Sequence, residues 1–495
     1  MLFNSYEFLF GFLPVVLLLF FLVGRRSALA AVGFLAAASL FFYGWWNPRY
    51  LLLLGGSVSF NYWVGRRLAL SPVRTGGDRA MLWLGIAANL TLLGAFKYAG
   101  FFAATANALA GLSLPIPHIV LPLGISFFTF TQIAYLVDAY RKEVREYRFA
   151  HYGLFVTFFP HLLAGPVLHH AEVMPQFARP DTFRFNPEHF AVGLTIFAIG
   201  LFKKMVLADG IADFATPVFD AARNGATLTF LAAWGGALSY TFQLYFDFSG
   251  YSDMAIGLAR LFGIVFPANF NSPYKASSII DFWRRWHMTL SRFLRDYLYI
   301  PLGGGRCRPL RRHANLMATM LLGGLWHGAG WTFVIWGGLH GLYIVLNHLW
   351  RGLHKRRLTP YSLPPAPARA LGQLLTFVAV VVAWVFFRAE SVTAARAVLE
   401  GMAGLNGVSR ADPYYFGNPE LKGLLAMFLV AWGLPNVQQL LRRYRPVLET
   451  YPGDVPANSR LAWHPSAAWA LLTAAMFIAA VVNLTRVSEF LYYQF

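Results

Sequence analysis

The sequence predicts an all-α, polytopic helical membrane protein with about eleven spans plus re-entrant segments. The chain has 495 residues, of which 57% are hydrophobic and only 13% are charged. That charged fraction is about half the value typical of soluble domains. Apolar runs of about 20 residues recur along the chain, and each is long enough to cross a hydrocarbon core. The short alternating segments of a transmembrane barrel are not seen.

Spans are expected where a long apolar run is bounded by charged or turn-forming residues. In the first third these are Tyr6–Val23, Leu29–Trp46, Tyr50–Val64, Met81–Phe96 and Ile119–Val137, with a weaker apolar piece at Phe101–Leu112. Later spans are expected at Phe190–Phe202, Leu228–Phe246, Leu371–Phe387, Leu421–Leu434 and Trp469–Val482. The region 388–420 is expected to be a mixed external loop. No internal repeat or linker interrupts the pattern, so we expect a single membrane domain over residues 1–495.

Basic residues indicate the orientation of the spans. The loops after the first, third and fifth spans are rich in Lys and Arg, as in the run YRKEVREYR at 140–148, whereas the loops after the second and fourth carry little charge. Since short basic loops stay on the cytoplasmic side, both termini are predicted to be periplasmic. The N-terminal run has no basic residue before it and no cleavage site, which favours an uncleaved first span over a signal peptide.

Two segments are predicted to enter the membrane without simply crossing it. His151–Leu168 is short and contains two prolines, which is typical of a broken or re-entrant segment beside a cavity. Leu316–Leu325 and Trp331–Leu349 lie between two basic regions, so they should form a hairpin that enters from the cytoplasm and returns. The first arm is short and is not required to span fully. His327 should lie near the far point of this hairpin.

His327 is the strongest single candidate for a functional residue. A titratable group inside an apolar stretch is costly to keep there and by default marks a functional site. Glycines crowd around it at positions 323, 324, 328 and 330, and glycines let backbones or a ligand approach closely. The alternative is a packed, hydrogen-bonded histidine.

The basic run from Asp281 to His313 is the candidate donor-binding region. The candidate donor-binding residues of this run are Arg284, Arg285, Arg292, Trp286 and His287. Trp326, in the predicted hairpin, is a further candidate. Guanidinium groups bind phosphates well, so this face suits a nucleotide-like donor at the cytoplasmic surface. The alternative for His287 is a solvated interfacial histidine. PLGGGR at 301–306 is only a glycine turn and matches no nucleotide-binding pattern.

Charged residues near the apolar segments are expected to form structural ion pairs or to line a tunnel. They are Asp247 and Asp253, which flank a predicted Ser-Gly-Tyr-Ser turn at the end of a span, together with Asp138, Arg141 and His161. No spacing among His161, His169, His170 and Glu172 matches a known metal site, so we expect no bound metal.

Several function classes are disfavoured. The net charge of +19 is divided among spanning segments, which argues against nucleic-acid binding and fits cytoplasmic loops that attract anionic lipid headgroups of the bilayer. The single cysteine, Cys307, allows no internal disulfide. A serine hydrolase is unsupported because no G-x-S-x-G elbow is present.

The central motifs nevertheless resemble one family over essentially the whole chain. They are DFSGYSDMAIGLARLFGI at 247–264, NFNSPYKASSIIDFWRRWHMTLSRFLRDYLYIPLGGGR ending at Arg306, and LLGGLWHGAGWTFVIWGGLHG ending at Gly341. FFPHLLAGPVL, LVDAYRKE, LFKKMVLAD and the terminal SEFLYYQF add support. Together they resemble the membrane-bound O-acyltransferase family, and most of all the branch that contains the membrane component of alginate O-acetylation.

This resemblance implies a ring of tilted helices around a central tunnel. His327 matches the family's catalytic histidine, and His287 matches a second polar family position. We therefore expect His327 to act as the general base and His287 to position or polarise a thioester. The resemblance also implies acetyl-CoA as the acyl donor, with no other cofactor bound.

The chain has no soluble catalytic domain of its own, so the resemblance implies a periplasmic partner transferase with a serine nucleophile, of the SGNH type. The final acceptor would be an exopolysaccharide, and the membrane the bacterial inner membrane. The tail Ser488–Phe495 is a candidate docking strand for that partner or a plug on the acceptor side.

Two other interpretations stay open. One is a related acyltransferase with another cargo, such as D-alanyl transfer to teichoic acid or the acylation of a lipid or protein. The other is a transporter without chemistry, which the lack of an internal repeat disfavours.

Overall fold

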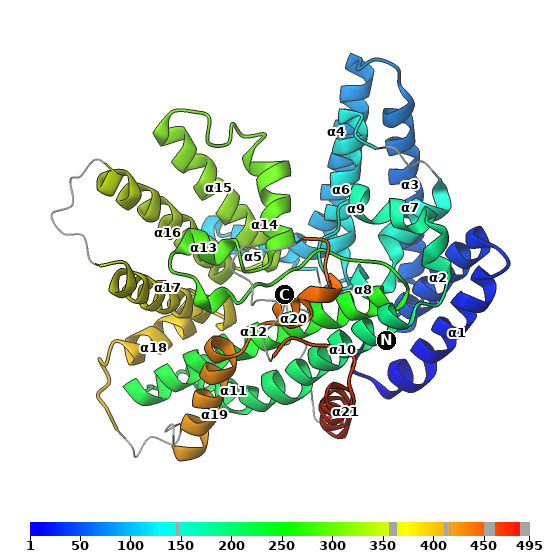
Figure 1. Ribbon diagram of the computed structural model, residues 1–495. Coiled ribbons are helices and arrows are strands. Elements are labelled where there is room, and N and C mark those ends of the chain that lie inside the picture. Colours follow the sequence, from blue (N-terminus) through cyan, green and yellow to red (C-terminus); the bar gives the residue numbers. More distant parts are fainter. Residues whose placement is uncertain are drawn as a thin grey trace. The chain divides into compact units, whose positions relative to one another are not determined.

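The computed structural model describes residues 1–117, 119–144, 148–355, 364–409, 414, 417–449 and 461–485. Within these residues every regular element is a helix, so the predicted all-α class is confirmed (Figure 1). Several segments with predictions lie outside the described residues, and those predictions stay predictions. They are the tail Ser488–Phe495, part of the basic region that follows the hairpin, and parts of the loops 140–148 and 388–420.

The helices of the first half follow the apolar runs of the sequence. They are α1 (Leu13–Gly24), α2 (Ala28–Gly44), α3 (Tyr50–Leu70), α4 (Gly76–Leu93), α5 (Ala99–Ala110), α6 (Ile125–Arg141), α7 (Phe149–Thr157), α8 (Phe159–Leu162), α9 (His170–Val173), α10 (Pro187–Phe202) and α11 (Asp209–Arg223). Short π or 3₁₀ segments join or extend some of them: η1 (Glu7–Phe12), η2 (Gly94–Tyr98), η3 (Met174–Ala178), η4 (Pro180–Phe183) and η5 (Lys203–Ala208).

The second half contains α12 (Phe230–Leu261), α13 (Ile279–Trp283), α14 (Met288–Leu294), α15 (Pro309–His327), α16 (Trp331–Lys355), α17 (Pro365–Arg388), α18 (Val392–Met402), α19 (Asn418–Phe428), α20 (Val437–Leu440) and α21 (Ala467–Val482). Its shorter segments are η6 (Pro273–Lys275), η7 (Arg295–Tyr299), η8 (Leu429–Gly433) and η9 (Arg442–Tyr444).

Four continuous helices among the described residues are long and apolar enough to cross a membrane: Glu7–Gly24, Gly76–Ala110, Pro187–Arg223 and Pro365–Arg388. Ala28–Gly44 and Ala467–Val482 are shorter apolar helices. The multi-pass character is thus present in the structure, while the predicted number of about eleven spans stays a prediction.

Contacts group the chain into two compact units. The first unit consists of Met1–Leu201, Tyr251–Ala268 and Val437–Thr485, and the second is built from Phe202–Gly250 and Asn269–Asn436. The long helix α12 contributes to both. The prediction of one domain over the whole chain stays a prediction.

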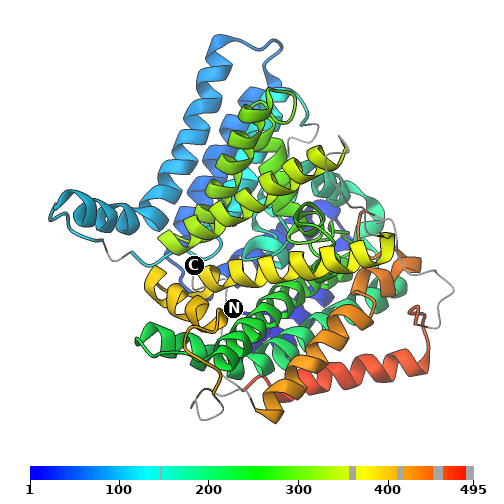
Figure 2. The same cartoon turned by 90° about the vertical axis from the view of Figure 1, so that its left-hand side faces the viewer.

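In the first unit, α3, α4 and α6 pack side by side (Figure 1). Close approach is possible because glycines face the neighbouring helix: a Cβ at Gly65 would overlap the ring of Tyr135, and one at Gly85 would lie 2.6 Å from Cδ1 of Leu136. The side chains of Asn61 and Asn89 hydrogen-bond to each other between α3 and α4. Figure 2 shows α5 turned away from the axis of α4, and the π segment η2 lies at the bend.

In the second unit, α15 and α16 form a hairpin that packs on α17, and α17 in turn contacts α18. Aromatic side chains fill much of the buried space. Phe282, Trp286, Trp336, Trp384 and Phe387 are all at most 2% exposed. This aromatic core surrounds the region where the sequence places the candidate site.

Three expectations are wrong. The Ser-Gly-Tyr-Ser stretch is no turn, because α12 runs through it as continuous helix to Leu261. The expected span from Ile119 instead becomes helical only at Ile125, since Pro122 cannot donate a helical hydrogen bond and Gly124 has a left-handed backbone with φ 69°. The region 388–420 is not all loop, because Val392–Met402 forms α18.

The predictions of a broken segment and of a helical hairpin agree with the structure. The helix at His151–Leu168 breaks at Phe158, between α7 and α8, which confirms the broken segment. The helical hairpin is also confirmed, although its first arm is longer than expected. Its entry into the membrane from the cytoplasm stays a prediction. Helix α15 begins at Pro309, within the basic run, because proline is well tolerated in the first turn of a helix.

Candidate functional site

The hairpin of α15 and α16 places His327 at the end of a helix. His327 is the last residue of α15, and α16 begins at Trp331. The two helices approach so closely that a Cβ at Gly324 would overlap the carbonyl of Phe333, and a Cβ at Gly337 would overlap the carbonyl of Met320. The glycines seen in the sequence therefore hold the backbones of the two arms together.

His287 is held by its backbone and by one side chain. It precedes α14 with a left-handed backbone, φ 42° and ψ 54°, which is uncommon for a residue with a Cβ. Its Nδ1 lies 3.1 Å from Oδ1 of Asn269. The backbone N–H of Met288 donates to the carbonyl of Asn269 at 2.9 Å, so the segment before α14 is hydrogen-bonded to the segment that contains Asn269. A strained residue held in this way is typical of a functional site.

The two histidines singled out in the sequence come together in the second unit. The ring centroids of His287 and His327 are 6.3 Å apart, with an angle of 61° between the planes. His287 is 0% exposed and His327 5% exposed. A group bound beside His327 would therefore meet a second imidazole in a buried setting.

Aromatic rings enclose His327. Trp326, Trp336 and Phe387 contact it edge-on, with centroids 4.9, 5.1 and 5.2 Å away. This packing excludes water from the imidazole and restricts its rotation. A group that reacts with water, such as a thioester, is protected from hydrolysis in such surroundings.

The protonation of His287 follows from its contacts. His287 lies outside the apolar helices, and burial lowers the pKa of its imidazole from 6.5 to about 3. The ring is therefore neutral near pH 7. An amide oxygen only accepts, so the Asn269 contact requires the proton on Nδ1. Among the described residues Nε2 has no hydrogen-bond partner, and it carries the lone pair of the neutral ring.

Two residues of this region were missed in the sequence. Asn269 orients His287, and His340 lies one helical turn after Trp336, with Trp283 Nε1 donating to its Nδ1 at 3.3 Å. The ring centroids of His340 and Trp336 are 4.8 Å apart. The i, i+4 spacing of Trp336 and His340 on α16 was the available signal for His340. No spacing rule connects Asn269 with His287, since the pairing is set by the tertiary fold.

The predicted donor-binding residues divide into two groups. Arg284 is exposed, while Arg285 is half-buried and pairs with Asp281 at 2.8 Å. Arg292 is half-buried on α14. Trp286 and Trp326 are only 2% and 4% exposed. Trp286 stacks in the aromatic core, 5.7 Å from Phe282, and that position favours packing over contact with a donor.

The charges on α12 have structural partners. Lys204 Nζ lies 2.6 Å from Oδ1 of Asp247 and 2.8 Å from Oδ1 of Asp209, and all three side chains are buried in the second unit. Asp253 belongs to the first unit, where Gln438 Nε2 donates to its Oδ1 at 3.3 Å. Continuous helix, rather than a turn, separates the two carboxylates.

His161 and Arg141 both lie in the first unit. His161 is buried beside the break in the helix, and its Nε2 is 2.7 Å from the carbonyl of Phe155. Arg141 ends α6, and its Nη1 is 3.7 Å from Oδ1 of Asp138. These contacts give both residues a structural role, and their placement along a tunnel stays a prediction.

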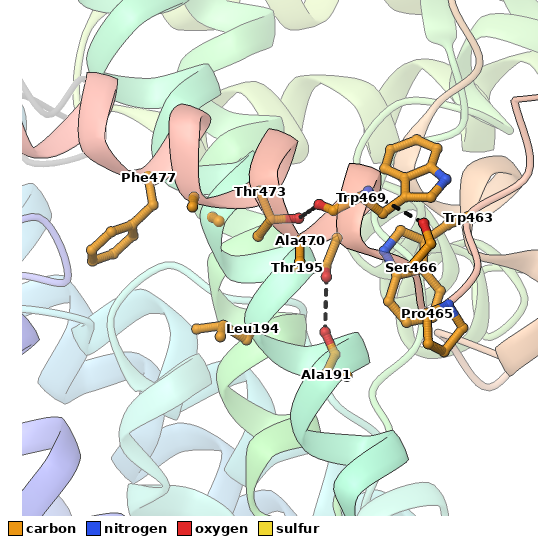
Figure 3. Close-up of a pocket in the computed structure, with 12 residues that line it drawn as sticks. Ala191, Leu194, Thr195, Trp463, Pro465, Ser466, Trp469, Ala470, Thr473 and Phe477 are labelled. Atoms are coloured by element: carbon orange, nitrogen blue, oxygen red, sulfur yellow. Dashed lines mark hydrogen bonds between the residues drawn. The ribbon is translucent and has the colours of Figure 1, made fainter.

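A cavity of about 460 Å³ also lies in the first unit, between α10 and α21 (Figure 3). It is lined by Leu194, Trp463, Trp469 and other mostly apolar side chains, and Thr195 donates its hydroxyl proton to the backbone carbonyl of Ala191. The described residues that line it include no titratable group, so the cavity suits an apolar chain rather than acid–base chemistry.

Comparison with known proteins finds one matching family and several similar proteins. The model of the MBOAT, membrane-bound O-acyltransferase family matches residues 80–389. The chain is 45% identical to the "Peptidoglycan O-acetyltransferase" of Helicobacter pylori, over 83% of this chain and 81% of that protein. It is 44% identical to the "Probable alginate O-acetylase AlgI" of Pseudomonas aeruginosa, over 81% and 75%, and 39% identical to the protein of that name from Azotobacter vinelandii, over the full length of both.

The family match covers the α15–α16 hairpin, His287 and the described parts of the second unit from Phe202 to Ala389. The expected resemblance, including that to the alginate O-acetylation branch, is confirmed, and so is the prediction of an acyltransferase. This chain therefore belongs to the membrane-bound O-acyltransferase family.

Proposed function

We propose that this chain transfers an acetyl group from cytoplasmic acetyl-CoA across the bacterial inner membrane for O-acetylation of an exported polysaccharide. The observation that carries the proposal is the buried pair His287 and His327, whose ring centroids are 6.3 Å apart. An acyltransferase of this kind needs a base for the acceptor hydroxyl and a dry site for the thioester. The aromatic enclosure of His327 supports the second requirement.

The transfer consists of one substitution at the acyl carbon. The acceptor hydroxyl oxygen attacks the thioester carbonyl carbon, and the imidazole of His327 takes the hydroxyl proton. The new C–O bond forms and the C–S bond breaks. The leaving thiolate then takes this proton from the His327 imidazolium, which returns His327 to its neutral form.

The contact with Asn269 favours a different role for His287 from the one expected from the resemblance. Polarising a thioester carbonyl requires a donor, but the only proton of neutral His287 points to Asn269. Its Nε2 is an acceptor. We therefore propose that His287 accepts a hydrogen bond that orients the acceptor hydroxyl or the ring of His327.

The donor is proposed to reach the site from the cytoplasm along the basic run. Arg284, Arg308 and Arg311 are exposed there and suit the phosphates of coenzyme A. The positive loops favour this side as cytoplasmic and both termini as periplasmic.

The proposed final acceptor is inferred from the names of the similar proteins. Because relatives at 39–45% identity bear the names alginate O-acetylase and peptidoglycan O-acetyltransferase, a cell-envelope polysaccharide is the proposed final acceptor. A periplasmic SGNH-type transferase would complete the transfer to the polymer. Another cargo, such as D-alanyl transfer to teichoic acid, is the alternative and differs in the donor.

Turnover of radiolabelled acetyl-CoA by the purified chain in detergent tests the proposal. The wild type should release or transfer label, and His327→Ala should lose this activity. His348→Gln, half-buried on α16, is the matched control and should retain it. Equal turnover by wild type and His327→Ala would contradict the role of His327. Failure of the wild type to bind acetyl-CoA would contradict the donor and favour another cargo.

A further inference from the structure

A cluster of metal-ligating side chains lies in the first unit and belongs to no part of the proposed chemistry. Asp138 is on the last turn of α6, and His169 and His170 lie at the start of α9. The ligand atoms of these three residues all lie within 4.8 Å of one another. The sequence separates Asp138 from the two histidines, which is why no spacing rule predicted a site.

The distances fit a single ion. His169 Nε2 is 2.9 Å and His170 Nδ1 is 3.3 Å from Oδ2 of Asp138. Ligands bound at 2.0–2.1 Å to a tetrahedral zinc ion lie roughly 3.3 Å from one another. Both histidine–carboxylate distances are therefore close to that of two ligands on one ion, and the two histidine nitrogens lie within 4.8 Å of each other.

His170 gives an independent reason to expect a ligand. Its side chain is 4% exposed, and in the part of the chain that the structure describes neither of its ring nitrogens makes a hydrogen bond. Buried polar atoms without partners are unfavourable and rare. Coordination through Nδ1 would satisfy the nitrogen that faces Asp138.

The surroundings orient the carboxylate and leave one side open. Arg141 Nη1 lies 3.7 Å from the other oxygen of Asp138, Oδ1, so Oδ2 is the oxygen turned to the histidines. The guanidinium charge opposes a cation, whereas the carboxylate and the carbonyl end of α6 favour one. The side chain of His169 is 30% exposed, which gives an ion and a water ligand access.

One existing contact must change on binding. The N–H of Ala171 approaches Nδ1 of His169 at 3.3 Å, so the proton of neutral His169 lies on Nε2. If Nε2 binds a metal, the proton moves to Nδ1 and this long contact is given up. A coordination bond replaces it.

We propose that Asp138, His169 and His170 form a binding site for a divalent transition metal, with Zn²⁺ as the ion that two imidazoles and one carboxylate favour. The fourth position is left to water. The ion would join the end of α6 to the start of α9 and so close the segment that contains the broken helix at Phe158. This inference does not rest on the proposed acyl transfer.

Zinc itself is the probe. The full chain is purified in detergent with its affinity tag removed, treated with a chelator, and titrated with ZnSO₄ by calorimetry and elemental analysis. We expect a single zinc ion per chain and a melting temperature that rises with zinc concentration, since an ion that binds only the folded state stabilises it. Co²⁺ should give the visible absorption of a tetrahedral site.

Asp138→Asn and His169→Gln should weaken zinc binding by more than the ~10–100-fold that loss of an outer-shell partner costs. His464→Gln, at an exposed histidine of the same unit, should bind like the wild type. If Asp138→Asn does not fold, zinc binding by His169→Gln tests the proposal, because the His169 side chain is 30% exposed and its substitution should disturb folding less. No zinc uptake by the wild type, or equal uptake by His169→Gln, would overturn the proposal and leave a metal-free hydrogen-bonded cluster.

Discussion

Oδ1 of Asn269 lies 3.1 Å from Nδ1 of His287. The backbone N–H of Thr289 donates to the same atom at 3.4 Å, and because a backbone N–H can only donate, this atom is the amide oxygen and not the nitrogen. The Thr289 hydroxyl also donates to it at 2.9 Å. Asn269 thereby selects the tautomer of His287 and the direction in which its lone pair points.

Substitution of Asn269 tests this positioning. Asn269→Leu removes the acceptor and should lower kcat by roughly 10²-fold or more while KM changes little, because Asn269 is 0% exposed and is proposed to act through His287. Asn269→Asp keeps an acceptor and should restore most of kcat. A negative charge beside the ring favours the imidazolium, so the acidic limb of the pH profile should move to higher pH in Asn269→Asp. An unchanged profile and an unchanged kcat in both variants would rule out the positioning role.

The burial of His287 predicts a pH dependence of stability. Its pKa is lowered to about 3 in the folded chain, against 6.5 for an ordinary histidine. Between these values the unfolded chain binds more protons than the folded chain, so this contribution to stability is complete above pH 6.5 and is lost as the pH falls toward 3. The melting temperature of the wild type should therefore drop more steeply below pH 6.5 than that of His287→Leu. Parallel curves for the two proteins would contradict the neutral, buried state.

The close packing of α15 on α16 predicts the effect of small substitutions. Gly324→Ala and Gly337→Ala would drive a methyl group into the backbone of the opposite arm. Each should destabilise the chain by roughly 1–3 kcal/mol and reduce activity, because His327 ends the strained arm. Gly352→Ala on α16 meets no atom within 4 Å and is the matched control, for which helix propensity predicts equal or higher stability. Thermal unfolding in detergent distinguishes the three.

Lys204 is predicted to be essential for folding. Lys204→Met would leave Asp209 and Asp247 buried without the cation that contacts both. Loss of one partner from a buried charge cluster costs roughly 3–5 kcal/mol, so expression of folded protein should fall sharply. Arg223→Met, which removes an exposed pair with Glu390, should have little effect. Partial recovery in Lys204→Met combined with Asp247→Asn would support the ion pair as the cause.

Particular residues show which features could be predicted from the sequence and which could not. His327 could be identified from the sequence because a titratable group in an apolar, glycine-rich stretch is costly and usually marks a functional site. The hairpin was predicted from the basic residues on both sides of it. The turn expected between Asp247 and Asp253 failed because α12 continues through residues of turn-like composition, and tertiary packing overrides such local preferences. Trp286 was grouped with the donor-binding arginines by proximity in sequence, yet it packs in the core.

Apolar run lengths, proline positions and charge asymmetry are properties of the sequence itself, and they determined the helical membrane class, the broken segment before Leu168 and the place of His327 at a hairpin. Only the tertiary structure decided that His287 meets His327, that Asn269 orients His287, and that Asp138 meets His169 and His170. Each of these contacts joins residues from separate elements. Local patterns constrain neighbours within a helix, whereas contacts between elements depend on how the whole chain packs.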